Sequence, residues 1–473
     1  MVTNSLSLKE KSISNILLVT SKFVTSRSLI GIRRIVSLLE LIALPKDKNF
    51  YRRIKSTLNE DNPQFQLYKR ILVESNENFR DKIIRNLLIK GAVLDQKKRE
   101  QEKRNGLEVP ASVLISPTMR CNLSCKGCYA SSYSKKDDLE FEVIDRIISE
   151  AKEMGVAFFT ILGGEPFIRD DIFSIFEKHN DVFFHVYTNG TLLNEETVKK
   201  IVSLGNVMPE ISIEGFEYDT DNRRGKHVYE KVLNAMKLLK ENKLPFGYSV
   251  TVTRNNIETI TSDKFIDMMI DNGAIIGWYF LYMPIGKNPD LSLMPTPEQR
   301  LYLKERRSYI RENKPLFIID FWNDAPYVGG CIAAKRYLHI NHRGDVEPCI
   351  FTHIAQVNIK NTTLREAIKC EFFEEIRKRQ PFSDNYYLPC MLIDHPEVSR
   401  WLYENLNVYP THPGAECMFT DIKNELDDYS KKVESLYQDV WEKEKQNFNI
   451  QIDQNKKDKD KNIKEKETVG AVS

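Results

Sequence analysis

The sequence lacks any apolar run long enough to cross a membrane. Its most apolar segment, residues 29–44, is interrupted by Arg33, Arg34 and Glu40, whereas a spanning helix needs about 20 mostly apolar residues. Residues 1–11 also lack the charged start, apolar stretch and small-residue cleavage site that are typical of a secretory signal. We therefore expect a cytoplasmic protein, with peripheral attachment to the inner face of the membrane as an alternative.

Excess charge is lacking as well, because 69 Lys and Arg residues oppose 67 Asp and Glu residues and leave a net charge of +2 over 473 residues. Nothing in this balance indicates a polyanionic partner, so we expect no nucleic acid. The hydrophobic share of 41% is enough for a sizeable core, and the charged share of 29% is typical of a soluble protein. The length predicts two or three domains.

Residues 1–106 form the first region and are predicted to be helical. They hold 22 Lys and Arg residues against 11 Asp and Glu residues, a local excess of 11 positive charges. Apolar residues recur at helical spacing over 29–44, and a second helical pattern covers 63–103. One interpretation is a helical cap packed on a catalytic domain. The other is a basic amphipathic surface that docks on anionic lipid.

Residues 107–320 alternate between short β-branched or aromatic runs and helical patterns. Such βα units indicate a parallel sheet, and six or more in succession predict an α/β fold, a partial (βα)6 TIM-like barrel. In such folds the chemistry gathers at the carboxyl ends of the strands. The expected strands are residues 112–116, 157–162, 182–188, 209–213, 246–253, 276–283 and 316–320.

The alternation ends near residue 320. Residues 321–425 are richer in Cys, His and Pro, which predicts a second, smaller domain. Residues 426–473 are expected to hold one helix followed by a charged tail, exemplified by residues 455–461. That tail has too little apolar surface to offset the entropy of ordering, so we expect disorder.

Three cysteines follow the first expected strand closely. Cys121, Cys125 and Cys128 have C-x3-C-x2-C spacing, which lets one tight loop present three thiolates to an iron–sulfur cube. A cube has four irons, so one iron keeps the open position that a catalytic metal centre requires. Zinc is the alternative, but a zinc knuckle usually adds a second Cys or His pair, and the next His is His179.

Several motifs in the order of the expected strands accompany these cysteines. Together with the cysteine loop, they make the chain resemble the radical S-adenosylmethionine (SAM) superfamily over about 210 residues. One departure is that Gly127 precedes the third cysteine, where the family often has an aromatic residue, and Tyr129 follows it. The motifs are Gly163-Gly164-Glu165-Pro166, Tyr187-Thr188-Asn189-Gly190, Ser212-Ile213-Glu214-Gly215, Arg223-Arg224-Gly225, Thr251-Val252-Thr253-Arg254-Asn255-Asn256 and Tyr282-Met283-Pro284.

The resemblance implies that SAM chelates the open iron of a 4Fe-4S cluster through its amine and carboxylate. Gly163 and Gly164 would allow close backbone approach to that amine, and Glu165 would accept its charge. The further SAM-binding candidates are Ser212 and Glu214 for the ribose or methionyl moiety, Asn255 for the ribose or carboxylate, Arg224 for the carboxylate, and Pro166, Asn189 and Tyr129 with no moiety assigned.

The same resemblance implies a reaction class. An electron from the reduced cluster splits SAM and leaves methionine and a 5′-deoxyadenosyl radical, which abstracts hydrogen from an unactivated C–H bond. The cluster would need an electron donor such as flavodoxin or ferredoxin. A scaffold that has lost SAM chemistry is the alternative, and the intact Gly-Gly-Glu-Pro segment favours the enzyme.

A second set of cysteines lies downstream. Cys331 and Cys349, with Gly344 between them, resemble the opening of the auxiliary-cluster domains called SPASM or twitch, and residues 337–349 read as a β-hairpin. With Cys390, this set predicts one auxiliary 4Fe-4S cluster. Zinc, or cysteines that bind no metal and only pack in a core, are the alternatives.

The fourth ligand of that cluster stays open between Cys370, His395, Cys417 and the substrate. The substrate itself is open too. Relatives with auxiliary clusters often modify peptides or proteins, whereas the basic, apolar N-terminal helices suit a lipid at a membrane surface.

Overall fold

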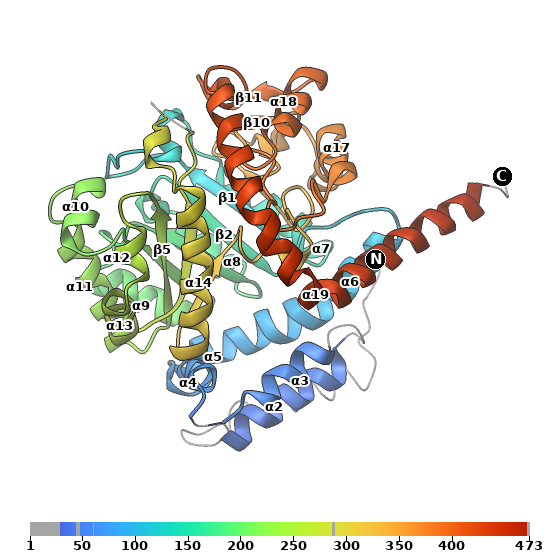
Figure 1. Ribbon diagram of the computed structural model, residues 1–473. Helices are drawn as coiled ribbons and strands as arrows, with labels where there is room; N and C mark the ends of the chain where they lie inside the picture. Colours follow the sequence, from blue (N-terminus) through green and yellow to red (C-terminus); the bar gives the residue numbers. More distant parts are fainter. Residues whose placement is uncertain (1–28, 44–47, 60, 286–288, 471–473) are drawn as a thin grey trace.

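A nine-stranded sheet forms the centre of the protein, and helices cover its outer face (Figure 1). The computed structural model describes residues 29–43, 48–59, 61–285 and 289–470. The strand order is β7-β6-β5-β4-β3-β2-β1-β8-β9, and every pairing is parallel except that of β8 with β9. Its first seven strands are β1 (Ser112–Thr118), β2 (Phe158–Gly163), β3 (Phe183–Thr188), β4 (Val207–Ser212), β5 (Phe246–Val252), β6 (Ala274–Leu281) and β7 (Phe317–Asp320).

These seven strands fall where the hydrophobic pattern predicted them, and the connections between most of them are helical. The α/β class is therefore confirmed. The helices after β1 to β7 are α7 (Phe141–Glu153), α8 (Ile172–Lys178), α9 (Glu195–Leu204), α10 (Glu217–Arg224), α11 (Val228–Glu241), α12 (Ile257–Thr261), α13 (Asp263–Asn272), α14 (Pro297–Asn313) and α15 (Ala325–Val328). Short 3-10 turns η4 (Tyr129–Ser132), η5 (Pro166–Ile168) and η6 (Leu291–Leu293) lie in the loops.

The sheet curves strongly, as a partial barrel requires. His185 of β3 and Trp278 of β6 have ring centroids 4.9 Å apart although β4 and β5 separate their strands in the sheet. Tyr187 and Phe280, one layer nearer the carboxyl ends, are 5.8 Å apart. Side chains from non-neighbouring strands can meet in this way only across a concave face.

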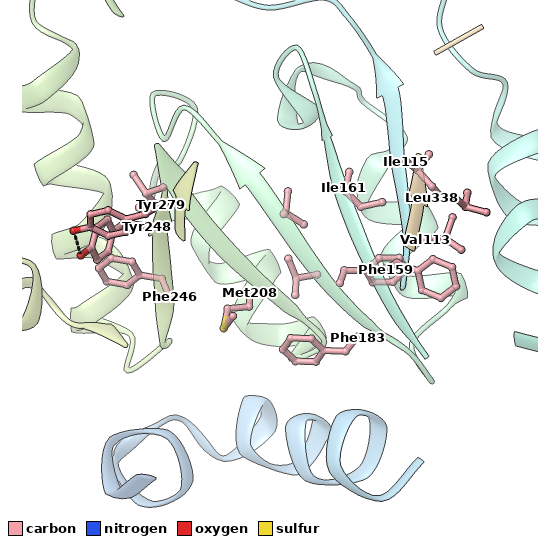
Figure 2. Close-up of a cluster of buried hydrophobic side chains, with 14 of the residues drawn as sticks. Val113, Ile115, Phe159, Ile161, Phe183, Met208, Phe246, Tyr248, Tyr279 and Leu338 are labelled. Atoms are coloured by element: carbon pink, nitrogen blue, oxygen red, sulfur yellow. Dashed lines mark hydrogen bonds between the residues drawn. The ribbon is translucent and has the colours of Figure 1, made fainter. Parts of the chain in front are cut away.

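The opposite face of the sheet is apolar and buried. Figure 2 shows Val113, Ile115, Phe159 and Ile161 on adjacent strands, and all four are buried in the main hydrophobic core. At the other end of the sheet, the hydroxyl groups of Tyr248 and Tyr279 hydrogen-bond at 3.0 Å, which gives both buried phenols a partner. Burial on both faces explains the near-continuous apolar runs of these strands.

The N-terminal helices lie at the amino ends of the strands. Asn86 donates to the carbonyl of Val182 (3.0 Å) just before β3, and the backbone of Asn76 donates to that of Lys243 (2.8 Å) before β5. This packing is the helical cap that one of the two sequence interpretations proposed. The elements are α2 (Leu29–Ile42), α3 (Lys48–Ser56), α4 (Pro63–Lys69), the π-helical η2 (Arg70–Glu74), α5 (Glu77–Lys82), the π-helical η3 (Ile83–Leu94) and α6 (Asp95–Arg104).

The apolar stripe of α2 is used inside the protein. Ile32, Val36 and Leu39 are buried in the main core, where α2 contacts α3 and η3. Leu41 of the same helix is 59% exposed. These contacts therefore favour the helical cap for part of the stripe, and attachment to a membrane stays a prediction. No helix among the described residues is long and apolar enough to span a bilayer. Residues 1–28 lie outside the described part of the chain.

The second cysteine-rich region extends the same sheet. The predicted hairpin is present as β8 (Tyr337–Ile340) and β9 (Val346–Glu347), and β8 pairs in parallel with β1. The sequence pattern did not predict that pairing. The remaining elements are β10 (Ile354–Ala355), η7 (Ile359–Asn361), α16 (Leu364–Ile368), α17 (Glu371–Arg379), α18 (Pro396–Asn405), β11 (Tyr409–Pro410), η8 (Ala415–Met418) and α19 (Lys423–Gly470).

The C-terminal segment differs from the expectation of a disordered tail. Helix α19 continues through the charged stretch to Gly470 and projects beyond the body of the protein in Figure 1. Lys, Glu and Gln are favourable helix formers, so a helix that begins on the protein surface can extend through them. The prediction counted apolar surface and left this propensity out.

Candidate active site

The first cysteine loop leaves the carboxyl end of β1 and is held from two sides. On one side, the amides of Gly164 and Glu165 donate to the carbonyls of Thr118 and Arg120, both at 2.9 Å. On the other side, the Arg223 side chain of α10 donates to the Lys126 carbonyl (3.2 Å). The Lys126 amide in turn donates to the Arg223 carbonyl (2.9 Å). The loop therefore bridges β2 and α10.

The glycine pair has a structural reason that differs from the expected one. A side-chain carbon on Gly163 would overlap the carbonyl oxygen of Thr118, and one on Gly164 would overlap that of Arg120. Gly163 also has φ of +120°, a conformation that L-residues rarely adopt. The close approach that these glycines permit is thus to the start of the cysteine loop, whereas we expected an approach to the SAM amine.

Glu165 is fully buried and links three elements. Its Oε1 accepts from the Thr188 hydroxyl (2.8 Å) and the Phe167 amide (3.2 Å), and its Oε2 accepts from the Asn189 amide (2.7 Å). A carboxylate has about four lone-pair sites, so one remains, on Oε2. Burial raises the pKa of Glu165 to about 7, although these three donors oppose the shift. Pro166 is buried and begins η5 directly after it.

Glu214 is a counter-ion in this structure. Its buried carboxylate accepts from Arg224 (Nε, 2.9 Å), from Arg223 and from the amide of Thr251 (3.2 Å). Both guanidinium groups bond to Oε1, whereas Oε2 accepts only the Thr251 amide, so the contact of Glu214 with the ribose or methionyl moiety stays a prediction. Both arginines also lie near Cys125, where they lower the pKa of a thiol that burial raises.

At the end of β5, two neighbouring asparagines differ in burial. Asn255 is exposed in the turn that follows the strand. Asn256 is buried instead, and its amide nitrogen donates to the carbonyls of Glu214 and Thr251, both at 3.0 Å. Ser212 lies where predicted, at the end of β4, with its hydroxyl 3.2 Å from that of Ser249.

Asn189 and Tyr129 lie on either side of the cysteine loop. The Asn189 side chain donates to the Asn122 side chain (2.8 Å) and approaches the Cys121 sulfur (3.8 Å). The Tyr129 hydroxyl faces the carbonyl of Gly163 at 3.4 Å. Both residues therefore contact the loop or its supports.

The auxiliary cysteines gather around one tyrosine. The Tyr337 hydroxyl lies 2.9 Å from the Cys349 sulfur. Burial and the neighbouring thiols of Cys349, Cys331 and Cys390 raise the pKa of Tyr337 well above its usual value. All three thiols therefore influence one phenol, and their assignment as ligands of one cluster stays a prediction.

Four of the six cysteine sulfurs accept a backbone N–H from the residue two positions later. The donors to Cys121, Cys331, Cys349 and Cys390 are Leu123 (3.4 Å), Ala333 (3.5 Å), Phe351 (3.5 Å) and Leu392 (3.4 Å). Such bonds favour the thiolate, which is the form that binds iron.

Burial raises the pKa of all three auxiliary thiols, that of Cys331 to about 12. These thiols would therefore stay protonated unless a metal replaced the protons. Within the described ranges, no three His, Cys, Asp or Glu side chains converge as ligands of one ion would. Each set nevertheless supplies three thiols, and cysteine thiolates are the usual ligands of an iron–sulfur cluster.

The side chains of two proposed fourth ligands have other neighbours, although the His395 amide donates to the Cys390 carbonyl at 2.9 Å. Cys370 is the N-cap of α17, where the amides of Phe373 and Phe372 face its sulfur. The two ring nitrogens of His395 face the Leu388 carbonyl (3.0 Å) and the Glu397 carboxylate (3.4 Å).

Cys417 is buried near Tyr282 and contributes to that phenol's raised pKa. The Tyr282 ring would overlap a side-chain carbon on Gly127. Cys417 therefore lies toward the first cysteine loop rather than toward the second set.

The two cysteine sets meet across a short aromatic contact. Tyr129, which follows Cys128, has its ring centroid 6.4 Å from that of Phe351, whose amide donates to Cys349. Beside them, the Tyr133 hydroxyl donates to the buried Glu347 carboxylate at 2.9 Å. The pairing of β8 with β1 creates this junction.

A family model described as "Radical SAM superfamily" matches residues 115–269, which include the first cysteine loop and the ends of β1 to β5. The chain belongs to the radical SAM superfamily. A second model, SPASM, an iron–sulfur cluster-binding domain, matches residues 331–391, from the first auxiliary cysteine to just beyond the third. The protein is therefore a radical SAM enzyme whose cofactors are a 4Fe-4S cluster with SAM and an auxiliary iron–sulfur cluster.

Relatives of this radical SAM enzyme include an AdoMet-dependent heme synthase of Methanosarcina barkeri, 27% identical over 57% of this chain and 85% of that protein. A PqqA peptide cyclase of Granulibacter bethesdensis is 24% identical over 62% of this chain and 82% of that protein. The crystal structure of Streptococcus suis SuiB bound to S-adenosylmethionine matches with a TM-score of 0.51 and 20% identity, over 60% of this chain and 71% of that one. At that identity the structural likeness shows the fold alone.

Four residues of this site were not singled out by the sequence analysis as site residues. Arg223, Asn256, Thr188 and Tyr337 each contact a predicted site residue. Arg223 and Asn256 stand directly beside the chosen Arg224 and Asn255, so the motifs marked the right segments. Only the turn geometry decides which of two adjacent side chains points inward.

Proposed function

We propose that this radical SAM enzyme removes a hydrogen atom from a peptide or protein substrate held between its two cysteine sets. The observation that carries the proposal is the Tyr129–Phe351 contact, which joins the first cysteine loop to the segment that holds Cys349. The similarity to a peptide cyclase supports the substrate class, because it covers 62% of this chain.

Cys121, Cys125 and Cys128 would hold the catalytic cluster, and Cys331, Cys349 and Cys390 the auxiliary one. When bound, the catalytic cluster supplies the electron that splits SAM into methionine and a 5′-deoxyadenosyl radical. A small redox protein such as flavodoxin or ferredoxin would deliver that electron.

The protein's own residues would bind and orient SAM. The remaining lone pair on Oε2 of Glu165 would accept from the SAM ammonium group. Arg224, held by Glu214 near Cys125, would face the SAM carboxylate. Ser212 and Asn189, at the ends of β4 and β3, would receive the ribose hydroxyls.

Aromatic side chains would keep water out of the reacting region. Phe280 contacts both Phe321 and Phe351, with ring centroids at 5.4 and 6.2 Å, and stacks on Trp278 at 6.5 Å. These rings extend from the inside of the sheet to the auxiliary region. A dry site protects a carbon radical from side reactions.

The cluster assignment is tested with the full chain, reconstituted with iron and sulfide without oxygen. Iron should approach about eight atoms per chain for two cubes and fall to about four when Cys121, Cys125 and Cys128 are all replaced by Ala. That variant should form no 5′-deoxyadenosine from SAM and dithionite. Cys370→Ser is the matched control and should keep both values. SAM cleavage by the triple variant would refute the assignment.

The substrate class is tested by mass spectrometry of peptides and proteins from cells with and without the gene. We expect one polypeptide whose mass differs between the two, and the purified enzyme should convert it with formation of 5′-deoxyadenosine. Conversion of no polypeptide, in extracts where SAM cleavage is active, would contradict the proposal.

A tetrapyrrole is the second candidate substrate. The observation that favours it is the similarity to the heme synthase, which covers 85% of that relative. An iron porphyrin precursor of heme, added to the reduced enzyme with SAM, should then change its absorption spectrum as 5′-deoxyadenosine accumulates. An unchanged spectrum during SAM turnover would exclude this candidate.

A further inference from the structure

Cys390 is held in place by hydrogen bonds to the residues that follow it. Its sulfur accepts from the Leu392 amide (3.4 Å), and its carbonyl accepts from the amides of Asp394 (3.0 Å) and His395 (2.9 Å). Its own amide donates to Oδ2 of the Asp394 carboxylate at 3.0 Å. Asp394 therefore bonds to both backbone groups of Cys390, to one through its amide and to the other through its side chain.

The second oxygen of the Asp394 carboxylate has a partner in another part of the chain. Oδ1 accepts from Nη1 of Arg300 on α14 at 2.6 Å, and both side chains are almost completely buried. Arg300 comes before the SPASM match, which begins at residue 331. The ion pair thus joins α14 to the loop that carries the third auxiliary cysteine.

Helix α19 packs beside this ion pair. The Tyr437 ring lies 5.5 Å from the guanidinium group of Arg300, a distance at which the ring face attracts the cation. The Tyr437 carbonyl also accepts from the side chain of Asn385 at 3.1 Å, in the segment that leads to Cys390. One residue of α19 therefore contacts both the ion pair and the chain that precedes the cysteine.

A buried ion pair is a poor source of stability. The cost of taking two charges out of water is high, and apolar residues of similar volume often stabilise a protein as well or better. In this pair, however, each oxygen of Asp394 has its own partner, Arg300 for Oδ1 and the Cys390 amide for Oδ2. Arg300 thereby fixes the direction in which the carboxylate faces the cysteine, which an apolar pair cannot do.

We propose that Asp394 is a positioning residue for Cys390, and that Arg300 orients its carboxylate while α19 shields the pair. This proposal rests on the auxiliary cluster that the proposed function assigns to Cys331, Cys349 and Cys390. It makes the third ligand of that cluster depend on α14 and α19, which both lie outside the segments matched by the two family models.

The test compares two double variants of the full chain, and both variants remove the ion pair. Arg300→Met/Asp394→Asn keeps a carbonyl oxygen that can accept from the Cys390 amide. Arg300→Met/Asp394→Leu has a side chain of similar shape at residue 394 and no acceptor. Both variants should fold, because a buried ion pair replaced as a unit is often tolerated. Each is reconstituted with iron and sulfide without oxygen and then titrated with an iron chelator.

The two variants should differ in how firmly they hold the auxiliary iron. Partners that orient a metal ligand are worth about ten- to a hundredfold in metal affinity. The Leu variant should therefore fall from about eight to about four irons per chain at a chelator concentration about ten- to a hundredfold lower than the Asn variant. After that loss it should still form 5′-deoxyadenosine from SAM and dithionite, and its electron paramagnetic resonance spectrum should keep only the signal that responds to SAM.

Arg307→Met is the matched control. Arg307 is also buried on α14 and pairs with Asp324, which keeps Arg311 as a second partner. This variant should resist the chelator as the Asn variant does. Equal chelator sensitivity of the two double variants would overturn the proposal. Iron loss from Arg307→Met as easy as from the Leu variant would overturn it too, because the loss would then follow from a weakened α14.

The iron content of the native chain separates this proposal from the proposed function. A native chain that holds no more than about four irons would refute the auxiliary cluster, and this proposal with it. A native chain with about eight irons and double variants that do not differ would refute the positioning role alone. If the Leu variant does not fold, Ala takes its place at residue 394, because Ala is smaller and also lacks an acceptor.

Discussion

SAM binding should depend on pH through Glu165. Burial raises the pKa of this carboxyl from 4.5 to about 7, so its charge changes near neutrality. An iron-bound SAM amine keeps N–H donors, and these gain a charge-assisted bond only from the carboxylate form of Glu165. Affinity should therefore rise with pH as Glu165 loses its proton.

The size of the effect follows from the fraction of ionised Glu165. With a pKa of about 7, that fraction falls from about 0.9 to about 0.1 between about pH 8 and about pH 6. The dissociation constant of SAM should then rise about tenfold, which corresponds to about 1.4 kcal/mol.

The assay is equilibrium dialysis of labelled SAM against the reconstituted enzyme without oxygen. The Glu165→Gln variant cannot ionise at this position, so its affinity for SAM should not change with pH. At the upper end of the pH range its affinity should be about ten- to a hundredfold weaker than that of the native enzyme, because one hydrogen bond to a charged group is lost. Glu195→Gln, an exposed position on α9, is the control and should keep the native profile. If the SAM affinity of Glu165→Gln changed with pH as steeply as that of the native enzyme, Glu165 would not be the titrating group. If the variant lost bound iron together with SAM affinity, Glu165 would have a structural role.

Three further outcomes are expected. Glu214→Ala should lower the free energy of unfolding by about 3–5 kcal/mol, because it leaves two mostly buried guanidinium groups unpaired; a denaturant midpoint close to that of the native chain would contradict this. Gly163→Ala should prevent cluster assembly, measured as bound iron, because the added carbon overlaps the Thr118 carbonyl. Gly414→Ala, which also has positive φ but no atom within 4 Å of the added carbon, should cost only about 1–2 kcal/mol and keep the iron. The full chain should not sediment with anionic vesicles at low salt, because Ile32, Val36 and Leu39 of α2 are buried; salt-reversible sedimentation would support the membrane interpretation.

Much of the catalytic region could be predicted because its signals are local. The spacing of Cys121, Cys125 and Cys128 places three thiols on one loop whatever surrounds it. The strands also followed from short apolar runs, because a parallel sheet buried on both faces leaves that pattern in each strand separately.

The direction of a single side chain could not be predicted from the sequence. Asn255 is exposed and its neighbour Asn256 is buried, and the sequence does not distinguish them. Arg223 and Arg224 are also neighbours, and both reach Glu214.

By itself, the sequence determined the α/β class, the cysteine loop, the glycine pair that follows β2 and the hairpin around Gly344. Each of these depends on residues close together in the chain. Only the tertiary structure decided that β8 pairs with β1, which brings Phe351 to Tyr129. It also decided that Ile32, Val36 and Leu39 of α2 are buried and that Cys417 lies by Tyr282 near the catalytic loop. These features depend on contacts between distant segments, and hydrophobic periodicity reveals that a face is apolar but not which surface covers it.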